Sequence, residues 1–192
     1  MRKDIILCGV GGQGTVLASR LISTAAMAKG LPVMSAETIG MAQRGGSVFS
    51  HVRIGEGVFS PMIAAGEADL ILAFEPGEAV RMLPYLREDG CMIVSDRAVM
   101  PVTASLAGTN YRGEEMTGFL REHVRKLTVL DAEKALRETG SMKVLNLVLL
   151  GAAVKEDALG LSREDLAEAI KARIPERLWD VNFRALDWAA EN

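Results

Sequence analysis

An apolar segment that runs directly into closely spaced glycines constrains this chain more than any other feature. Residues 5–14 read IILCGVGGQG, and Gly9, Gly11 and Gly14 follow the spacing G-x-G-x-x-G. In this pattern one glycine permits a tight turn, one lets the backbone approach a diphosphate, and one lets a helix pack against the strand. The N-terminus of that helix offers unpaired N–H groups to an anion. The segment therefore predicts a strand, a phosphate-binding turn and a helix.

The turn is the first half of the predicted binding site. Its members are Gly9, Gly11, Gly12, Gln13 and Gly14. An acidic residue, Glu37, stands about 20 residues further on, where a dinucleotide-binding enzyme would use a carboxylate on a ribose hydroxyl. A glycine-rich turn that serves only tight packing is the alternative interpretation, and an ordinary surface loop would also account for Glu37.

Apolar runs alternate with helical periodicity over the first two-thirds of the chain. This alternation predicts an α/β fold, Rossmann-like, with a mostly parallel sheet and helices on its faces. The expected strands cover residues 3–10, 32–37, 48–54, 69–74, 91–95 and 127–130. The expected helices between them cover residues 15–29, 77–86, 114–126 and 131–139. Asp131 suits the N-cap of the last of these helices.

One strand departs from the parallel pattern. Residues 48–54 alternate in hydropathy, and Gly55-Glu56-Gly57 supplies a turn before Val58-Phe59. We therefore expect a hairpin excursion at this point of the sheet.

The chain after Gly140 predicts a C-terminal helical layer with helices at 142–158, 162–173 and 175–190. Ser162 is placed as an N-cap with Asp165 at N3, and Pro175 stands in a first turn, where proline is tolerated. Residues 142–158 are apolar on almost every side, which fits either a central helix of the chain or a subunit interface. With no linker or repeat in view, we expect residues 1–192 to form one domain.

Composition excludes several classes of protein. With 192 residues, of which 49% are hydrophobic and 24% charged, the chain can bury a full core. A net charge of −3 without a basic cluster argues against a nucleic-acid partner. The longest apolar run, residues 144–154, contains Asn146 and is too short to cross a bilayer. Asp4 and the glycines interrupt any signal-peptide core, so the sequence favours a cytoplasmic protein without membrane contact.

The cysteines and histidines do not form a recognisable catalytic or metal site. Cys8 and Cys91 lie in separate strand-like runs and suit core packing. His51 alternates on a strand with aromatic and charged neighbours, and His123 sits on a charged helix, so both are interpreted as structural or surface residues. Hydrolase, P-loop and zinc-protease motifs are also missing from the sequence. We therefore expect no catalytic residue and no metal ligand in this chain.

A second glycine-rich element stands before the expected hairpin. Residues 42–47 read AQRGGS, and in a doubly wound sheet this loop would emerge at the same carboxyl edge as the first turn. Arg44 would then supply a cation to a bound phosphate, with Gln43 beside it. Alternatively, Gly45 and Gly46 shape the entry to the hairpin and Arg44 is a solvated charge.

Three segments together resemble a known family. They are GVGGQG at 9–14, ETIGMAQRGGSVFSHVRIG at 37–55 and NLVLLGA at 146–152. The combination is similar to the gamma-type subunit of 2-oxoacid:ferredoxin oxidoreductases, and to the equivalent small beta subunit of indolepyruvate:ferredoxin oxidoreductase. The resemblance extends over nearly the whole chain.

The resemblance implies a role within a larger enzyme. Such enzymes oxidatively decarboxylate 2-oxoacids with thiamine diphosphate and magnesium, pass electrons through iron–sulfur clusters to ferredoxin, and release an acyl-CoA. It places these cofactors on partner subunits, which agrees with the presence of only two cysteines here. For this chain it implies a Rossmann-like domain beside the coenzyme A approach, with the glycine turn, Gln43 and Arg44 facing it. Related fused enzymes tend to have lysines where Gln43 and Arg44 stand.

Two further hypotheses stay open on the sequence. One is a free-standing NAD-dependent oxidoreductase that uses Glu37 on the ribose, and the other is an interaction module whose turn binds no ligand. The identity of the 2-oxoacid, the direction of flux and the number of partner chains cannot be read from these residues.

Overall fold

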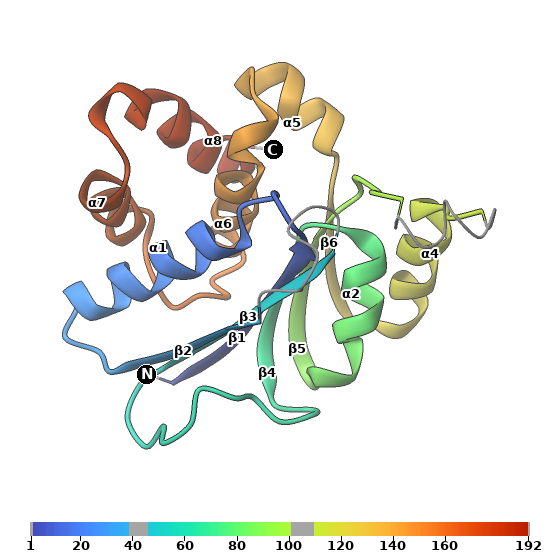
Figure 1. Cartoon of the computed structure of the whole chain (residues 1–192), viewed down its shortest axis with the longest axis horizontal. Helices are drawn as coiled ribbons and strands as arrows, with labels where there is room; N and C mark the ends of the chain where they lie inside the picture. The colour runs from blue at the N-terminus through green and yellow to red at the C-terminus, as the bar shows by residue number, and fades with distance from the viewer. Residues whose placement is uncertain (1, 39–45, 101–109, 192) are drawn as a thin grey trace.

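The computed structural model describes residues 2–38, 46–100 and 110–191. Within them, six strands form one sheet in the order β2-β3-β1-β4-β5-β6. The strands are β1 Lys3–Val10, β2 Val33–Thr38, β3 Ser47–Ile54, β4 Ala68–Ala73, β5 Leu86–Ser95 and β6 Lys126–Leu130. This sheet with helices on both faces confirms the predicted α/β class (Figure 1).

Strand β3 is the reversed strand of the sheet. It pairs antiparallel with both β1 and β2, whereas β1, β4, β5 and β6 pair in parallel. The expected antiparallel excursion is therefore confirmed. The expectation that a hairpin continues into Val58-Phe59 is wrong, because neither residue belongs to a strand. Strands β2 and β3, which follow one another in the chain, form the antiparallel pair instead. With β1 on its other edge, β3 has partners on both sides for its backbone N–H and C=O groups.

Seven α-helices lie in the described residues. They are α1 Thr15–Ala28, α2 Pro76–Met82, α4 Gly113–His123, α5 Ala132–Thr139, α6 Leu145–Lys155, α7 Arg163–Arg173 and α8 Trp179–Glu191. Asp131 caps α5, and Ser162 forms a capping box with Asp165 at the start of α7, as predicted.

Several helix boundaries were predicted wrongly, including the end of α4, which lies at His123 and not at residue 126. The α2 helix ends at Met82 in a 3-10 turn that contains Pro84, because proline has no N–H to continue a helix, and β5 then begins at Leu86. Residues 142–144 and 176–178 are also 3-10 turns, so α6 and α8 begin three and four residues later than expected. The α6 helix also ends earlier, at Lys155.

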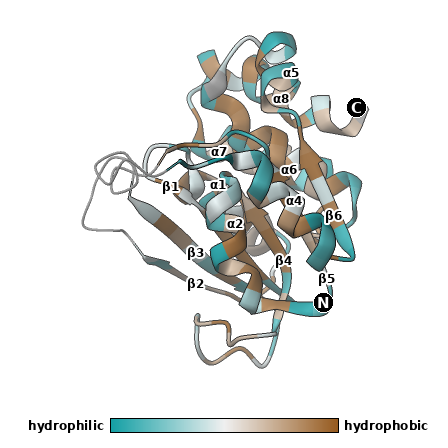
Figure 2. Ribbon diagram, turned by 90° about the vertical axis from the view of Figure 1, so that its right-hand side faces the viewer, coloured by the Kyte–Doolittle hydropathy of each residue, from teal (hydrophilic) through white to brown (hydrophobic). Residues whose placement is uncertain are grey.

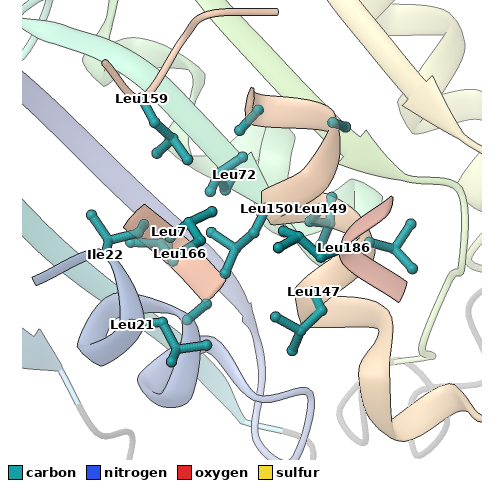
Figure 3. Close-up of a cluster of buried hydrophobic side chains, with 14 of the residues drawn as sticks. Leu7, Leu21, Ile22, Leu72, Leu147, Leu149, Leu150, Leu159, Leu166 and Leu186 are labelled. Carbon is teal, nitrogen blue, oxygen red and sulfur yellow. The ribbon is translucent and has the colours of Figure 1, made fainter. Parts of the chain in front are cut away.

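The helices form two layers (Figure 1). Helices α1, α5, α6, α7 and α8 share one hydrophobic core with the first face of the sheet, and α2 and α4 cover the other face. Figure 2 shows hydrophobic residues along the central strands and α6. Figure 3 shows leucines of α6 meeting side chains of β1, β4, α1, α7 and α8 in the larger core.

Helix α6 is the centre of this core. It contacts α8, α1, α5 and β5 of its own chain, and residues 145–153 are buried. The central-helix interpretation is therefore correct. A Cβ on Gly151 would lie 2.0 Å from the carbonyl oxygen of Leu186, so α6 and α8 can approach this closely only because residue 151 is glycine.

Candidate functional site

The order of the strands places a ligand-binding position between β1 and β4. The chain leaves β1 toward β3 and β2 on one side, and continues from β4 toward β5 and β6 on the other. In open α/β sheets such a switch point leaves a crevice at the carboxyl ends of the strands, where ligands bind. The glycine turn follows β1 at this edge, and Glu75 follows β4.

The glycines of the turn have distinct structural roles. A Cβ on Gly9 would come within 2.6 Å of Gln13 Oε1 and 2.9 Å of Phe74 Cβ, so Gly9 allows the end of β1 to pack closely. Gly12 and Gly14 have φ angles of 99° and 88°, in the left-handed region that favours glycine. Gly14 is also the N-cap of α1. The turn conformation thus depends on this spacing of glycines.

Several groups of the turn are occupied by hydrogen bonds within the protein, among them the backbone N–H of Gln13, which donates to the carbonyl oxygen of Val10 at 3.2 Å. Gln13 Oε1 accepts from the backbone N–H of Val10 at 2.8 Å, and Gln13 Nε2 donates to the carbonyl oxygen of Phe74 at 3.0 Å. The N–H of Gly11 donates to the carbonyl oxygen of Gly46 at 2.9 Å. Gln13 therefore holds the turn in place through its side chain. The hydrogen bond from Gly11 to Gly46 places the end of the second glycine-rich element beside the glycine turn. This agrees with the expectation that both elements lie at the carboxyl edge of the sheet.

Helices α1 and α2 both begin at this edge, but their N-termini differ. Glu75 caps α2, and its Oε2 accepts from the backbone N–H of Glu78 at 3.0 Å. Among the described residues, the first turn of α1 has neither a side-chain cap nor an acidic residue. The partial positive charge at the start of α2 is already matched by a carboxylate, whereas the start of α1 is open to an external anion.

A buried acidic cluster lies at the capped start of α2. Glu75 and Glu78 are 3% and 6% exposed, and Glu75 Oε1 accepts hydrogen bonds from the Tyr111 hydroxyl and the N–H of Val99. Glu78 Oε2 accepts from Ser47 Oγ at 2.6 Å. Burial and the hydrogen bond to Glu75 raise the pKa of Tyr111 well above its usual value, so Tyr111 stays a donor.

This cluster also influences Cys8. Burial raises the pKa of the Cys8 thiol, and the charges of Glu78 and Glu75 raise it further. Cys8 is fully buried and therefore inert, as core packing predicted, and Cys91 is half-buried. The acidic cluster was not foreseen from the sequence, although an acidic residue followed by proline after an apolar strand is a recognisable N-cap signal.

Glu37 does not stand where a dinucleotide enzyme needs it. Strand β3 separates β2 from β1, so the end of β2 is about 10 Å from the end of β1 across the sheet. Ser19 Oγ donates to Glu37 Oε1 at 3.2 Å, and Arg20 Nε lies 3.9 Å from the same oxygen. This carboxylate is thus engaged by α1, which counts against the NAD hypothesis. Gln43 and Arg44 lie outside the described residues.

The histidines have the structural and surface roles expected of them. His51 is buried, and its Nδ1 accepts from the backbone N–H of Ile63 at 3.1 Å. His123 is exposed on α4 and stacks against Phe119. The described part of the chain contains no group of three or more His, Cys, Asp or Glu residues able to hold a metal ion. It also contains no helix long and apolar enough to span a membrane.

A pocket of about 680 Å³ lies further along the same edge, at the ends of β5 and β6. Its lining residues are Asp96, Arg97, Ala98, Asp131, Ala132, Glu133 and Leu136. Three carboxylates against one guanidinium make this pocket less favourable for a phosphate than the start of α1. The glycine turn is therefore the better candidate for an anion.

Comparison with known proteins gives this site a family context. The model of the family described as Pyruvate ferredoxin/flavodoxin oxidoreductase matches residues 4–192. The indolepyruvate oxidoreductase subunit IorB of Thermococcus kodakarensis is 39% identical over 186 residues, covering 96% of this chain and 92% of the relative. The pyruvate/ketoisovalerate oxidoreductases common subunit gamma of Pyrococcus abyssi is 30% identical over 191 residues, covering 98% and 95%.

Solved structures share the fold. The gamma subunit of the keto/oxoacid ferredoxin oxidoreductase of Geobacter sulfurreducens superposes with a TM-score of 0.71 at 25% identity, over 98% of this chain and 96% of that one. The 2-oxoglutarate:ferredoxin oxidoreductase of Magnetococcus marinus, solved with 2-oxoglutarate, coenzyme A and succinyl-CoA bound, superposes with a TM-score of 0.67 at 18% identity. This chain matches 31% of that longer one, and the likeness is one of fold.

Proposed function

Because the chain belongs to the pyruvate ferredoxin/flavodoxin oxidoreductase family, we propose that it is the gamma-type subunit of an enzyme that oxidatively decarboxylates a 2-oxoacid to an acyl-CoA. In this proposal residues 1–192 form a single gamma-type domain that contributes to coenzyme A binding and to assembly. The reaction is completed by partner chains of the same complex, with ferredoxin as the electron acceptor and a cytoplasmic location.

The open N-terminus of α1 is the observation that carries the coenzyme A assignment. Coenzyme A has a diphosphate and a 3′-phosphate, and the start of α1, directly after the glycine turn, offers backbone amides to an anion at the switch point of the sheet. Gly9, Gly11, Gly12, Gln13 and Gly14 form or support the diphosphate site. Arg44, with Gln43 beside it, supplies the contact to the 3′-phosphate, since a guanidinium matches a phosphate group.

The redox cofactors belong to partner subunits in this proposal. A [4Fe–4S] cluster needs four thiolates, and the sequence has two cysteines, one of them fully buried. Thiamine diphosphate and its magnesium ion are likewise assigned to a partner chain. In this proposal the chain binds and assembles and does not catalyse alone.

A pair of substitutions at Gly12 tests the site. Asp and Asn have nearly the same shape and tolerate a positive φ angle better than other side chains, so Gly12→Asp and Gly12→Asn introduce similar backbone strain. They differ by one negative charge beside the bound diphosphate. We expect Gly12→Asp to raise the KM for coenzyme A about tenfold more than Gly12→Asn in the assembled enzyme.

The same experiment separates the alternatives. Equal KM values for the two Gly12 variants and the wild type would favour an interaction module whose turn binds no ligand. Binding of NADH to the purified chain would revive the NAD hypothesis. Anaerobic purification of the tagged chain, with mass spectrometry of accompanying proteins, tests assembly directly, and recovery of the chain alone would contradict it.

A further inference from the structure

One polar side chain interrupts the apolar helix α6 beside the glycine turn. Asn146 lies in the first turn of α6 and is 1% exposed, with leucines on both sides of it in the sequence. Within the described residues its Oδ1 has no hydrogen-bond partner. An unpaired buried amide costs stability that a leucine at the same position would not. Packing alone therefore does not account for Asn146.

The Asn146 amide lies directly against the start of α1. Its Nδ2 is 3.1 Å, and its Cγ 3.3 Å, from the position that a Cβ on Gly14 would occupy. Gly14 is the N-cap of α1, the residue at which the open helix end begins. The hydrogen-bond donor of the side chain thus faces the glycine turn.

Two side-chain amides meet this turn, and their hydrogen bonding differs. Gln13 uses both ends of its amide inside the protein, on Val10 and Phe74. The Asn146 amide has an oxygen without a partner in the described part of the chain. The Gln13 amide fixes the turn. The unpaired Oδ1 of Asn146 is an acceptor and cannot pair with a phosphate oxygen, whereas its Nδ2, which lies against Gly14, is the end of the amide that can donate to one.

We propose that Asn146 is a ligand-binding residue, and that its Nδ2 donates a hydrogen bond to a phosphate oxygen of the coenzyme A diphosphate held at the start of α1. This inference rests on the proposed function. A neutral amide suits the position because it adds a donor to the backbone amides without burying a charge, and a hydrogen bond to an anionic oxygen is stronger than one between neutral groups.

Substitutions in the assembled enzyme test this role, with coenzyme A as the variable substrate. Asn146→Leu removes the donor at similar volume. We expect the KM for coenzyme A to rise about tenfold, as for loss of one hydrogen bond to a charged group, with kcat at saturating coenzyme A retained. The unfolding midpoint should stay equal or increase. Asn146→Asp keeps the shape but repels phosphate, so its KM should rise further.

A second buried asparagine provides the matched control. Asn182 in α8 is 6% exposed, and its Nδ2 donates to the carbonyl oxygen of Leu178 at 2.7 Å. Asn182→Leu should lower the unfolding midpoint without changing the KM for coenzyme A.

The outcomes separate this inference from the proposed function. An unchanged KM in Asn146→Leu, together with a raised KM in Gly12→Asp relative to Gly12→Asn, overturns the role of Asn146 and leaves the coenzyme A site. An unchanged KM in all of them overturns both. A lower midpoint and lower kcat in Asn146→Leu at constant KM would show a purely structural role.

Discussion

Gln13 Nε2 donates a hydrogen bond to the carbonyl oxygen of Phe74 at 3.0 Å, which ties the glycine turn after β1 to the end of β4. The other end of the same amide accepts from the N–H of Val10 at 2.8 Å. One side chain thereby fixes the spacing of the two strands between which a ligand is expected. The rigidity of the candidate site rests on this amide.

Gln13→Glu tests that bridge. At neutral pH the carboxylate faces the carbonyl oxygen of Phe74 without a proton to donate, so we expect the free energy of unfolding to fall by about 1–3 kcal/mol. Protonation of the new carboxyl at acidic pH restores a donor and should recover part of the loss relative to wild type. Urea titrations at both pH values measure this. Gln13→Met, which cannot titrate, is the control and should show the same deficit at both.

Removing one partner of the buried ion pair Asp4–Arg53 should cause a large loss of stability. Arg53 Nε donates to Asp4 Oδ1 at 2.7 Å, and both residues are under 9% exposed. Arg53 also donates to the carbonyl oxygens of Ser60 and Met62, and so anchors the segment between β3 and β4. Asp4→Ala leaves the guanidinium buried without its carboxylate, which should lower the free energy of unfolding by about 3–5 kcal/mol.

An exposed ion pair provides the comparison for Asp4→Ala. Arg125 and Glu88 lie 2.9 Å apart with side chains 68% and 78% exposed. Glu88→Ala should change stability by less than about 1 kcal/mol. Denaturant titrations of both variants measure the two losses in the free energy of unfolding. Similar losses would mean that the buried pair contributes no more to stability than the exposed pair.

The lowered pKa of His51 predicts how the stability of the protein changes with pH. Burial, and secondly the charge of Arg53, lower the pKa of His51, and its Nδ1 accepts the Ile63 N–H only when unprotonated. Because the folded pKa lies below the unfolded value of about 6.5, the unfolded state binds more protons in this window. Stability should be fully present above about pH 6.5 and fall as the pH drops through the folded pKa.

Substitution of each histidine in turn checks this assignment. His51→Asn keeps an acceptor for the Ile63 N–H and should flatten the fall in the free energy of unfolding between pH 7 and pH 5. His123→Asn, on the exposed face of α4, should retain the wild-type slope. A wild-type slope in His51→Asn would assign the dependence to other groups.

Two helical glycines predict opposite effects of the same substitution. Gly151→Ala places a methyl group 2.0 Å from the carbonyl oxygen of Leu186, so α6 and α8 must separate, at a cost of about 1–3 kcal/mol or more. Gly118 in α4 has no atom within 4 Å of its Cβ position, and Gly118→Ala should stabilise by about 0.5–1 kcal/mol. Thermal unfolding of the two variants measures the direction of each change in stability. A stable Gly151→Ala protein would show that α6 and α8 can separate at little cost.

Local chemistry explains what the sequence predicted correctly. The caps at Asp131 and Ser162 depend on residues three positions away, and both occur as expected. The glycine spacing predicted the turn after β1, because positive φ angles at Gly12 and Gly14 are a local requirement. Signals of this short range can be read without knowledge of the fold.

Tertiary pairing explains what the sequence could not provide. The hydropathy of residues 48–54 predicts a strand but not its neighbours, and β3 lies between β1 and β2 and pairs with both, not with a strand at Val58-Phe59. That insertion also moves Glu37 away from the turn. The roles of Gln13 and Asn146 depend on contacts across 61 and 132 positions in the chain, which no local pattern contains.

The proposed assignment of each phosphate group of coenzyme A to particular residues gives a final prediction, for Arg44. In the proposal the glycine turn and Asn146 bind the diphosphate of coenzyme A, whereas the guanidinium of Arg44 binds the 3′-phosphate. Arg44→Ala should therefore raise the KM for coenzyme A about tenfold and leave the KM for 3′-dephospho-coenzyme A unchanged, since only the former carries the group that Arg44 contacts. Gln43→Ala removes no charge and should have a smaller effect.

The same two substrates separate Arg44 from the turn. Gly12→Asp and Asn146→Leu should raise the KM for both forms of coenzyme A, because the diphosphate is common to them. Higher salt should weaken the Arg44 effect, as screening reduces a charge–charge contact. Equal KM increases for both substrates in Arg44→Ala would assign Arg44 to the diphosphate, and no increase for either would remove it from the site. The ratio of the two KM values thus identifies which phosphate each residue binds.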